Sequence, residues 1–149
     1  MKFEFSAGGI VFKSENIGIS VLLCQHSLNH SWGFPKGRIG DVIEKESQES
    51  TAVREVKEET GIDAKILQKL TPFQYWYVFE GEKRKKKVSY FLMRHLGGDI
   101  TVHDHEMENV EWLREEDVEK RLSYPGDRKV WKEAKEIIEK SIKYWVLGY

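Results

Sequence analysis

The chain has little of what stabilises secreted and membrane proteins. Its 149 residues include one cysteine, Cys24, so disulfides within the chain and a cysteine-based metal site are excluded. Cys24 follows the apolar run 21–23, which predicts a small, buried side chain. No apolar stretch approaches the ~18 residues that a membrane-spanning helix needs. Residues 1–4 resemble the start of a strand and not a signal peptide, so we expect a cytoplasmic protein that contacts no membrane.

The chain also lacks an excess of charge of either sign. Its formal net charge is −1, so no overall field attracts it to nucleic acid, and we expect no nucleic-acid partner. Hydrophobic residues make up 40% and aromatic residues 12%, which is typical of a folded globular protein. The length predicts a single domain over residues 1–149.

The order of the expected elements favours a mixed sheet packed between helices. Alternating β-rich segments predict strands over residues 3–12, 17–25, 66–79, 85–96 and 110–113. Helical spacing predicts helices over residues 47–61, 115–122 and 127–145. The first is expected to bury Ala52, Val53 and Val56, and the last to bury Val130, Ala134, Ile137, Ile138 and Ile142. Residues 80–82 are expected to form a hairpin turn. The long loop 27–42 has no pattern of its own, which favours a functional role.

Three glutamates on the first predicted helix carry the strongest chemical signal. Glu55, Glu58 and Glu59 stand at positions i, i+3 and i+4, so their carboxylates share one helix face. Like charges at these spacings cost a helix about 0.2–0.5 kcal/mol per pair, which implies a counter-charge. Carboxylate oxygens without histidine or cysteine favour a hard ion such as Mg²⁺. Ser47 is the expected N-cap of this helix and Gly61 its C-terminal stop.

The segment around these glutamates resembles the signature of the Nudix hydrolases. It reads Gly40, five residues, Glu46, seven residues, and then the run Arg54-Glu55-Val56-Lys57-Glu58-Glu59-Thr60-Gly61-Ile62. The resemblance implies an α/β/α sandwich with a mixed sheet and the catalytic helix on one side of it. It also implies hydrolysis of a pyrophosphate bond in a nucleotide with Mg²⁺, for which Mn²⁺ can substitute.

The resemblance also implies a role for each residue of the motif. Glu58 and Glu59 would be the firmest metal ligands, and Glu55 either a ligand or the base that activates water. Glu46 would be an outer ligand. Arg54 is expected to orient the carboxylates, starting with Glu58 at i+4.

Two further metal contacts follow from the family pattern. The strict spacing assigns the glycine of the motif to Gly40, whereas Gly37 lies in the Pro-Lys-Gly segment; either carbonyl could reach the metal. Glu106 stands six residues before Trp112 and is the candidate for a further carboxylate from a loop; the alternative is a solvated acid.

Five further segments are spread over nearly the whole chain: residues 4–9, 31–37, 75–77, 88–93 and 124–127. They resemble the diadenosine tetraphosphate hydrolase branch of the family. By this resemblance Lys36 and Lys86 would bind phosphates, and Tyr77 and Tyr124 would stack on adenine. His30 lies near the expected phosphate loop. The rest of the lysine-rich run 83–87 is interpreted as a solvated edge strand.

The leading hypothesis is cleavage of diadenosine tetraphosphate into ATP and AMP. Alternatives with the same chemistry are ADP-ribose, nucleoside triphosphates and diphosphoinositol phosphates as substrates. An alternative of another class is a non-catalytic nucleotide- or RNA-binding module, against which the retained glutamates argue. The protein would be a monomer or a homodimer.

Overall fold

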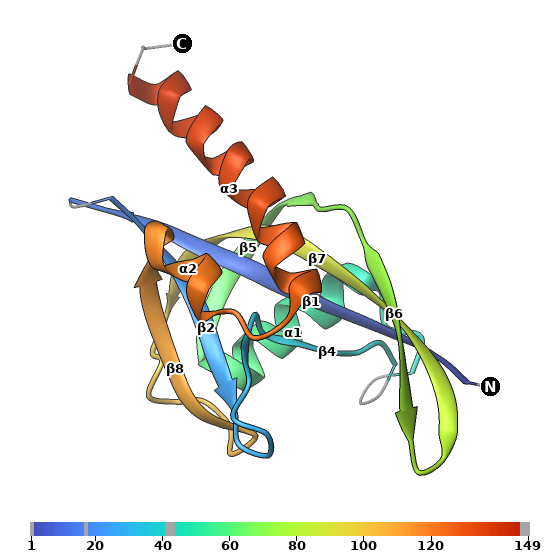
Figure 1. Ribbon diagram of the computed structural model, residues 1–149. Coiled ribbons are helices and arrows are strands. Elements are labelled where there is room, and N and C mark those ends of the chain that lie inside the picture. Colours follow the sequence, from blue (N-terminus) through green and yellow to red (C-terminus); the bar gives the residue numbers. More distant parts are fainter. Residues whose placement is uncertain (1, 17, 41–43, 147–149) are drawn as a thin grey trace.

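The computed structural model describes residues 2–16, 18–40 and 44–146, with side chains as far as Ser141 (Figure 1). The strands are β1 (Lys2–Glu15), β2 (Gly18–His26), β3 (Trp32–Gly33), β4 (Lys36–Arg38), β5 (Ile62–Lys69), β6 (Phe73–Phe79), β7 (Glu82–Gly98) and β8 (Met107–Arg114). The helices are α1 (Gln48–Thr60), α2 (Glu115–Arg121) and α3 (Pro125–Val146). None of these helices is both long and apolar enough to span a membrane.

One mixed sheet organises the fold. Its main order is β3-β2-β1-β7-β5, while β4 also pairs with β1, β6 with β7, and β8 with β2. Strands β1 and β7 run parallel from the pair Lys2 and Arg84 to the pair Phe12 and Arg94. The other pairings are antiparallel. The expected mixed sheet is therefore confirmed.

Each face of the sheet carries a hydrophobic cluster. Helix α3 packs Val130, Trp131, Ala134 and Ile138 against one face, and α2 adds Val118 to the same cluster. Helix α1 covers the other face (Figure 1), where Ala52 and Val56 are fully buried with residues of β1, β5 and β7. This arrangement confirms the α/β/α sandwich. The expected burial of Val53 is wrong, because this side chain is 38% exposed.

Two predicted elements differ from the structure. The single strand expected over residues 66–79 is two strands, β5 and β6. Between them, the Leu70 amide donates to the carbonyl of Tyr90, and the Thr71 amide donates to the Glu133 carboxylate at 2.9 Å. The loop expected over residues 27–42 contains the short strands β3 and β4, and its last two residues lie outside the described ones. The side chain of Ile142, which was expected in the core, also lies outside the part of the chain that the structure describes.

The lysine-rich run does not lie on an edge strand. Residues 84–87 of β7 pair with β1 on one side, and residues 82–88 pair with β6 on the other. Of the three strands β1, β7 and β6, strand β6 is therefore the outermost here. The interpretation of the run as an edge strand that discourages aggregation is therefore wrong.

Candidate active site

Helix α1 is fixed at both ends. The Ser47 hydroxyl accepts a hydrogen bond from the Ser50 amide at 3.1 Å, and the Gly61 amide donates to the carbonyl of Lys57 at 2.8 Å. Gly61 has a φ of 79°, and a Cβ there would lie 2.1 Å from the carbonyl oxygen of Asp99. Only glycine combines that backbone conformation with so close a neighbour. The predicted limits of the helix are confirmed, and the caps set which way its glutamates point.

Arg54 connects three of the predicted site carboxylates. Its Nε donates to Glu46 Oε2 at 2.9 Å, and its Nη1 donates to Glu55 Oε1 and to Glu58 Oε2, both at 3.0 Å. Hydrogen bonds to Glu46 hold the pKa of Arg54 above its usual value. The same hydrogen bonds lower the pKa of Glu46. One guanidinium thus gathers the three acidic side chains that the sequence placed near a metal.

Two of the glutamates on α1 are buried, although they are acidic. Glu55 is 8% exposed and Glu59 is 4% exposed, whereas the Glu58 side chain is 42% exposed. Burial raises the pKa of Glu55, and Glu58 raises it further. Burial and then Glu55 raise the pKa of Glu59 well above its ordinary value. Buried carboxylates of this kind call for a cation.

The donor chemistry of this cluster fits a divalent cation. Glu46, Glu55, Glu58 and Glu59 supply only carboxylate oxygens, the ligands that Mg²⁺ and Mn²⁺ prefer. Within the described ranges, no three acidic, histidine or cysteine side chains already converge on one point. The Arg54 guanidinium bonds to Glu55 Oε1 and Glu58 Oε2. A metal ion that bound to either of these oxygens would compete with Arg54.

The loop glycine that lies against the cluster is Gly37. A Cβ at Gly37 would stand 2.0 Å from Glu55 Cδ and 2.2 Å from its Oε1. Gly40 is exposed, and no described residue comes within 4 Å of the position that its Cβ would take. The geometry thus favours Gly37 over Gly40, which the motif spacing had assigned to the metal.

Lys36 joins the phosphate loop to the acidic helix. Its backbone amide donates to Glu59 Oε1 at 3.2 Å, and the Cys24 thiol lies 4.0 Å from the same oxygen. Burial opposes the charge of Lys36, but Asp127, Tyr75 and Glu59 together raise its pKa. Cys24 is buried as predicted.

Lys86 belongs to the same region. Burial and then the charge of Lys36 lower the pKa of Lys86. The two ammonium groups are therefore close enough to interact electrostatically.

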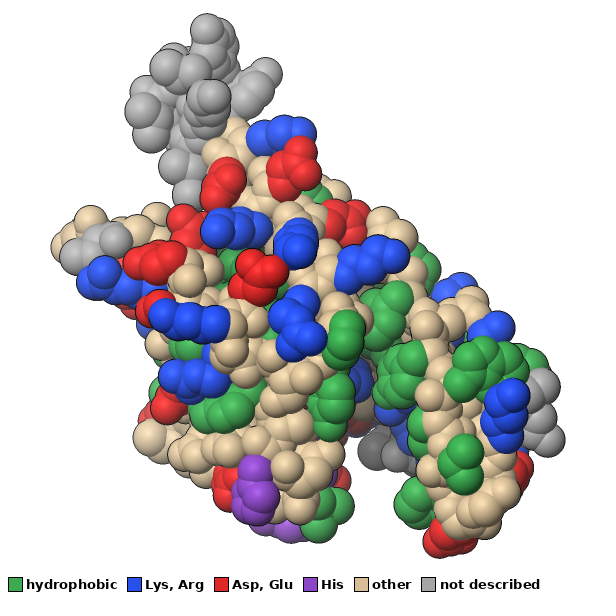
Figure 2. All heavy atoms as spheres, in the orientation of Figure 1, with side chains coloured by type: hydrophobic (Ala, Val, Ile, Leu, Met, Phe, Trp, Pro, Cys, Tyr) green, Lys and Arg blue, Asp and Glu red, His purple; other side chains and the backbone are tan. Residues whose placement is uncertain are grey.

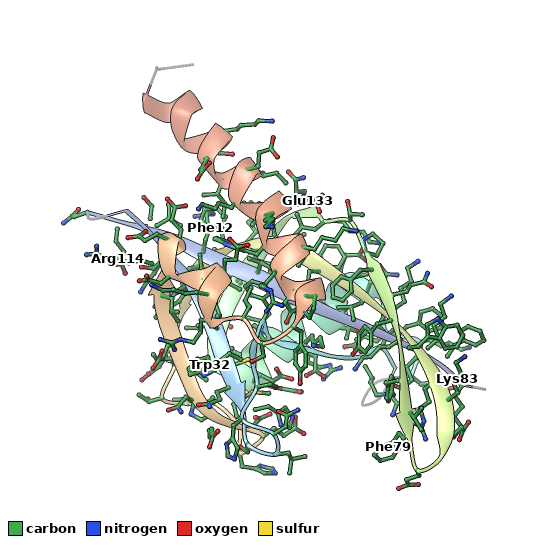
Figure 3. All side chains as sticks on the ribbon, in the orientation of Figure 1. Phe12, Trp32, Phe79, Lys83, Arg114 and Glu133 are labelled. Carbon is green, nitrogen blue, oxygen red and sulfur yellow. The ribbon has the colours of Figure 1, made fainter. Side chains whose placement is uncertain are left out.

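A row of aromatic rings runs along one face of β6. The ring centroids of Phe73 and Tyr75 are 6.4 Å apart, and those of Tyr75 and Tyr77 are 6.1 Å apart. Figure 2 shows a cleft between the β6–β7 hairpin and the rest of the molecule. In Figure 3, Phe79 lies on the side of the hairpin toward this cleft and Lys83 on the opposite side. Trp76 is 48% exposed on the Lys83 side and does not pack in the core.

Tyr124 and His30 lie beside the loop between β2 and β3. The Tyr124 hydroxyl accepts a hydrogen bond from Asn29 Nδ2 at 3.2 Å, and its ring is 46% exposed. His30 bonds to Glu108 through Nδ1 and has a φ of 59°. Tyr124 raises the pKa of Tyr75, after burial and Asp127, so the two tyrosines lie within electrostatic reach.

The loop between β7 and β8 brings Asp104 to α1. The Asp104 amide donates to the carbonyl of Glu58 at 3.0 Å. After burial and Glu55, the charge of Asp104 also raises the pKa of Glu59, whereas Lys36 lowers it. Glu106 is exposed, and its amide donates to Asp104 Oδ1 at 3.1 Å. The sequence analysis missed Asp104, although it stands in the same acidic segment.

A second missed residue is Asp127, in the first turn of α3. It is 2% exposed, and its Oδ1 accepts a hydrogen bond from the Tyr90 hydroxyl at 2.9 Å. A Cβ at Gly33 would lie 2.9 Å from its Oδ2. The sequence offered two signals: Asp127 stands at the expected start of the last helix, and it ends the segment 124–127 that resembles the family branch.

The NUDIX domain family model matches residues 2–134, so the chain belongs to the Nudix family. Its fold, its acidic helix and the glycine stop after that helix agree with this assignment.

Particular relatives narrow the comparison. The chain is 39% identical over 109 residues to mutator protein MutT4 of Mycobacterium tuberculosis, which covers 73% of this chain and 43% of that protein. It is 32% identical over 120 residues to the asymmetrical bis(5′-nucleosyl)-tetraphosphatase of Caenorhabditis elegans, covering 80% and 85%. The crystal structure of a C. elegans Ap4A hydrolase binary complex has a TM-score of 0.74 at 25% identity, covering 92% and 98%.

The relatives differ in how much of their length the chain spans. It spans less than half of MutT4 and 28% of an 8-oxo-(d)GTP phosphatase of Mycolicibacterium smegmatis, to which it is 34% identical. It spans most of the tetraphosphatase.

Proposed function

We propose that the protein hydrolyses a pyrophosphate bond of a nucleoside polyphosphate with Mg²⁺, and that diadenosine tetraphosphate, cut into ATP and AMP, is its preferred substrate. The observation that supports the proposal is that basic side chains lie next to the acidic helix α1. The amide of Lys36 donates a hydrogen bond to Glu59, and the positive charge of Lys36 lowers the pKa of Lys86. Carboxylates for a metal and ammonium groups for phosphates thus adjoin each other.

Each group has a part in this chemistry. A bound divalent ion would neutralise phosphate charge and lower the pKa of a coordinated water. Glu58 and Glu59 would hold it, with Glu46 outside them and Glu55 either as a ligand or as the base for the water. Arg54 would keep the carboxylates in place. Lys36 and Lys86 would bind the outer phosphates as point charges.

The aromatic row supports a substrate that carries bases. Tyr77, with Tyr75 beside it, offers ring faces on the hairpin, and Tyr124 offers one from the start of α3. Base stacking on such rings is worth about 1–3 kcal/mol per base. The similarity to a tetraphosphatase over most of its length supports the same substrate. We further expect the protein to act in the cytoplasm, as a monomer or a homodimer.

Product analysis tests the proposal. With Mg²⁺, diadenosine tetraphosphate should give ATP and AMP in equal amounts, and EDTA should abolish the reaction. ADP as the sole product would overturn the asymmetric cut. Glu58→Gln should lower kcat by about 10²–10⁴-fold. If this variant kept wild-type turnover and metal dependence, the assigned site would be wrong. Nucleotide binding by the wild type without any turnover would make the chain a binding module.

A nucleoside triphosphate is the second candidate substrate, because the chain is also similar to an 8-oxo-(d)GTP phosphatase. ADP-ribose and diphosphoinositol phosphates complete the panel. The ratios of kcat/KM across these substrates decide between them. A higher kcat/KM for a substrate with one base would contradict the assignment of two base-stacking sites, at Tyr77 and Tyr124.

Lys86 and Lys87 provide a matched pair for the phosphate contacts. They are neighbours on β7, but their side chains lie on opposite faces of the strand. Lys86→Gln should raise KM for diadenosine tetraphosphate about tenfold, whereas Lys87→Gln should leave it unchanged. Equal effects of both changes would indicate general electrostatic attraction instead of a defined contact.

A further inference from the structure

The face of the hairpin turned away from the cleft has a composition of its own. Strand pairing places Trp76 opposite Lys85 on β7, and Lys85 opposite Phe3 on β1. Because side chains alternate along strands, the same face carries eight residues: Phe3, Phe5, Gln74, Trp76, Val78, Lys83, Lys85 and Lys87. We call these eight residues the outer hairpin face. The proposed function uses none of them.

The apolar side chains of the outer hairpin face are open to solvent. Phe3 is 58% exposed, Phe5 54%, Trp76 48% and Val78 70%. Phe3, Phe5, Gln74, Lys85 and Lys87 also line one shallow hollow, together with Glu4. Large apolar side chains that gather at one exposed place mark a binding surface more often than scattered ones do.

The charge of this face has one sign. It carries three lysines and no acidic side chain, and none of the ion pairs among the described residues includes Lys83, Lys85 or Lys87. The ammonium groups of Lys83 and Lys85 lie 4.6 Å and 5.1 Å from the centre of the Trp76 ring. These cations are therefore available to an anionic partner.

The spacing of the lysines selects the kind of anion. Alternate residues of a strand are about 6.6–6.8 Å apart, so the three lysines form a straight row with a repeat comparable to that of phosphates along an extended nucleic-acid strand. Rings lie on both sides of the row, Trp76 on β6 and Phe3 and Phe5 on β1. Proteins recognise single-stranded nucleic acid with two elements: cationic side chains that follow its backbone, and aromatic side chains on which its bases stack.

We propose that the outer hairpin face binds single-stranded nucleic acid. Lys83, Lys85 and Lys87 contact successive phosphates, and bases stack on Trp76, Phe3 and Phe5. Lys83 and Lys85 leave the Trp76 ring as they reach the phosphates, which frees the ring for a base. The net charge of −1 gives no general attraction, so binding depends on this face.

Fluorescence anisotropy with a labelled oligouridylate of about 20 nucleotides tests the proposal on the full chain. We expect binding that weakens as salt rises from about 50 to 200 mM, with a slope of log K against log salt of about −0.7 per phosphate contact. The triple variant Lys83→Gln/Lys85→Gln/Lys87→Gln should make this slope shallower by about 2. The control Lys120→Gln/Lys129→Gln/Lys132→Gln removes the same charge from exposed positions of α2 and α3 and should keep the wild-type slope.

A second variant tests the stacking. Trp76→Leu should weaken binding about 5- to 150-fold and leave the slope unchanged, because a ring is lost and no phosphate contact. Hydrolysis of diadenosine tetraphosphate should be the same in wild type, the triple variant and Trp76→Leu, so a failure of the proposed function would not affect this test.

Three outcomes would overturn the proposal. The first is absence of detectable binding by the wild type. The second is an equal loss of binding in the triple variant and its control. The third is binding of the triple variant with wild-type affinity while it loses adhesion to phosphatidylserine vesicles, which would make the face a membrane-contact surface.

Discussion

The α-carbon of Gly37 packs directly against the carboxylate of Glu55, so closely that a Cβ would stand 2.0 Å from Glu55 Cδ. Strand β4, which carries Gly37, and helix α1, which carries Glu55, meet at this contact. It limits how closely the strand and the acidic helix approach each other.

Gly37→Ala should therefore displace Glu55. We expect a loss of about 1–3 kcal/mol in the free energy of unfolding from overpacking, and a fall in kcat of about a hundredfold from misplacement of the carboxylate. Urea denaturation and steady-state kinetics measure the two effects. Gly97→Ala is the control, since no described atom lies within 4 Å of its Cβ position. Equal activity of the two variants would show that Glu55 tolerates displacement.

Removal of Arg54 should make the protein depend on metal for stability. Arg54→Gln leaves Glu46, Glu55 and Glu58 without their shared partner and should cost about 3 kcal/mol in EDTA. Mg²⁺ should restore more stability to this variant than it adds to the wild type, because the ion supplies the missing positive charge. Thermal denaturation with and without Mg²⁺ gives the comparison.

The control for this experiment is Arg114→Gln, which removes an exposed pair with Glu116 at 3.8 Å. That change should stay within about 0.5 kcal/mol of the wild type and show an ordinary response to metal. If Mg²⁺ shifted all three proteins equally, the ion would bind away from the Arg54 cluster.

Neighbouring aromatic residues on opposite faces of β6 allow a test of base stacking. Tyr77→Ala should raise KM for diadenosine tetraphosphate about 5- to 150-fold, whereas Trp76→Ala should not change it. Tyr77→Phe keeps the ring and removes the hydroxyl that bonds to Glu4, so it should behave like the wild type. An equal rise of KM in Tyr77→Phe and Tyr77→Ala would assign the effect to the hydroxyl.

The buried Glu4 should give the protein a defined loss of stability in acid. A hydrogen bond from Tyr77, and then Arg84, hold the pKa of Glu4 below the 4.5 of a free glutamate, although burial opposes them. Because the folded state binds the proton less tightly, Glu4 stabilises the fold above about pH 4.5, and this contribution disappears as the pH falls through the lowered pKa.

Glu4→Gln tests this dependence. The difference in free energy of unfolding between wild type and variant should be constant from about pH 7 to pH 5.5 and should shrink below about pH 4.5. Urea titrations at several pH values measure it, with the exposed Glu116→Gln as the control. A difference that grew toward low pH would reverse the assigned direction.

Much of this fold could be predicted from the sequence because local signals and tertiary contacts agree. Ser47 and Gly61 delimit α1 in both, and glutamate spacing predicts the acidic face. The break between β5 and β6 could not be predicted, since it depends on bonds from Leu70 and Thr71 to Tyr90 and Glu133, which are distant in the sequence.

Two details of the site depend on tertiary contacts in the same way. Motif spacing assigned the metal contact to Gly40 with Gly37 as the alternative, and the path of β4 brings Gly37 to Glu55. Helical spacing placed Val53 on the buried side of α1, yet Val53 is 38% exposed, whereas the acidic Glu55 is 8% exposed. Whether each of these side chains is buried depends on what packs against it and not on its own hydropathy.

The two caps of α1 also limit which insertions this protein could accept. One residue added between them would turn the following glutamates by about 100° and carry Glu58 and Glu59 away from Lys36. Residues added before Glu46, which bonds to Arg54, would lengthen the exposed connection that includes Glu44 and Lys45 and leave the helix in register. Length variation among functional descendants of this chain should therefore gather before that glutamate and be absent from the thirteen helical positions that follow Ser47.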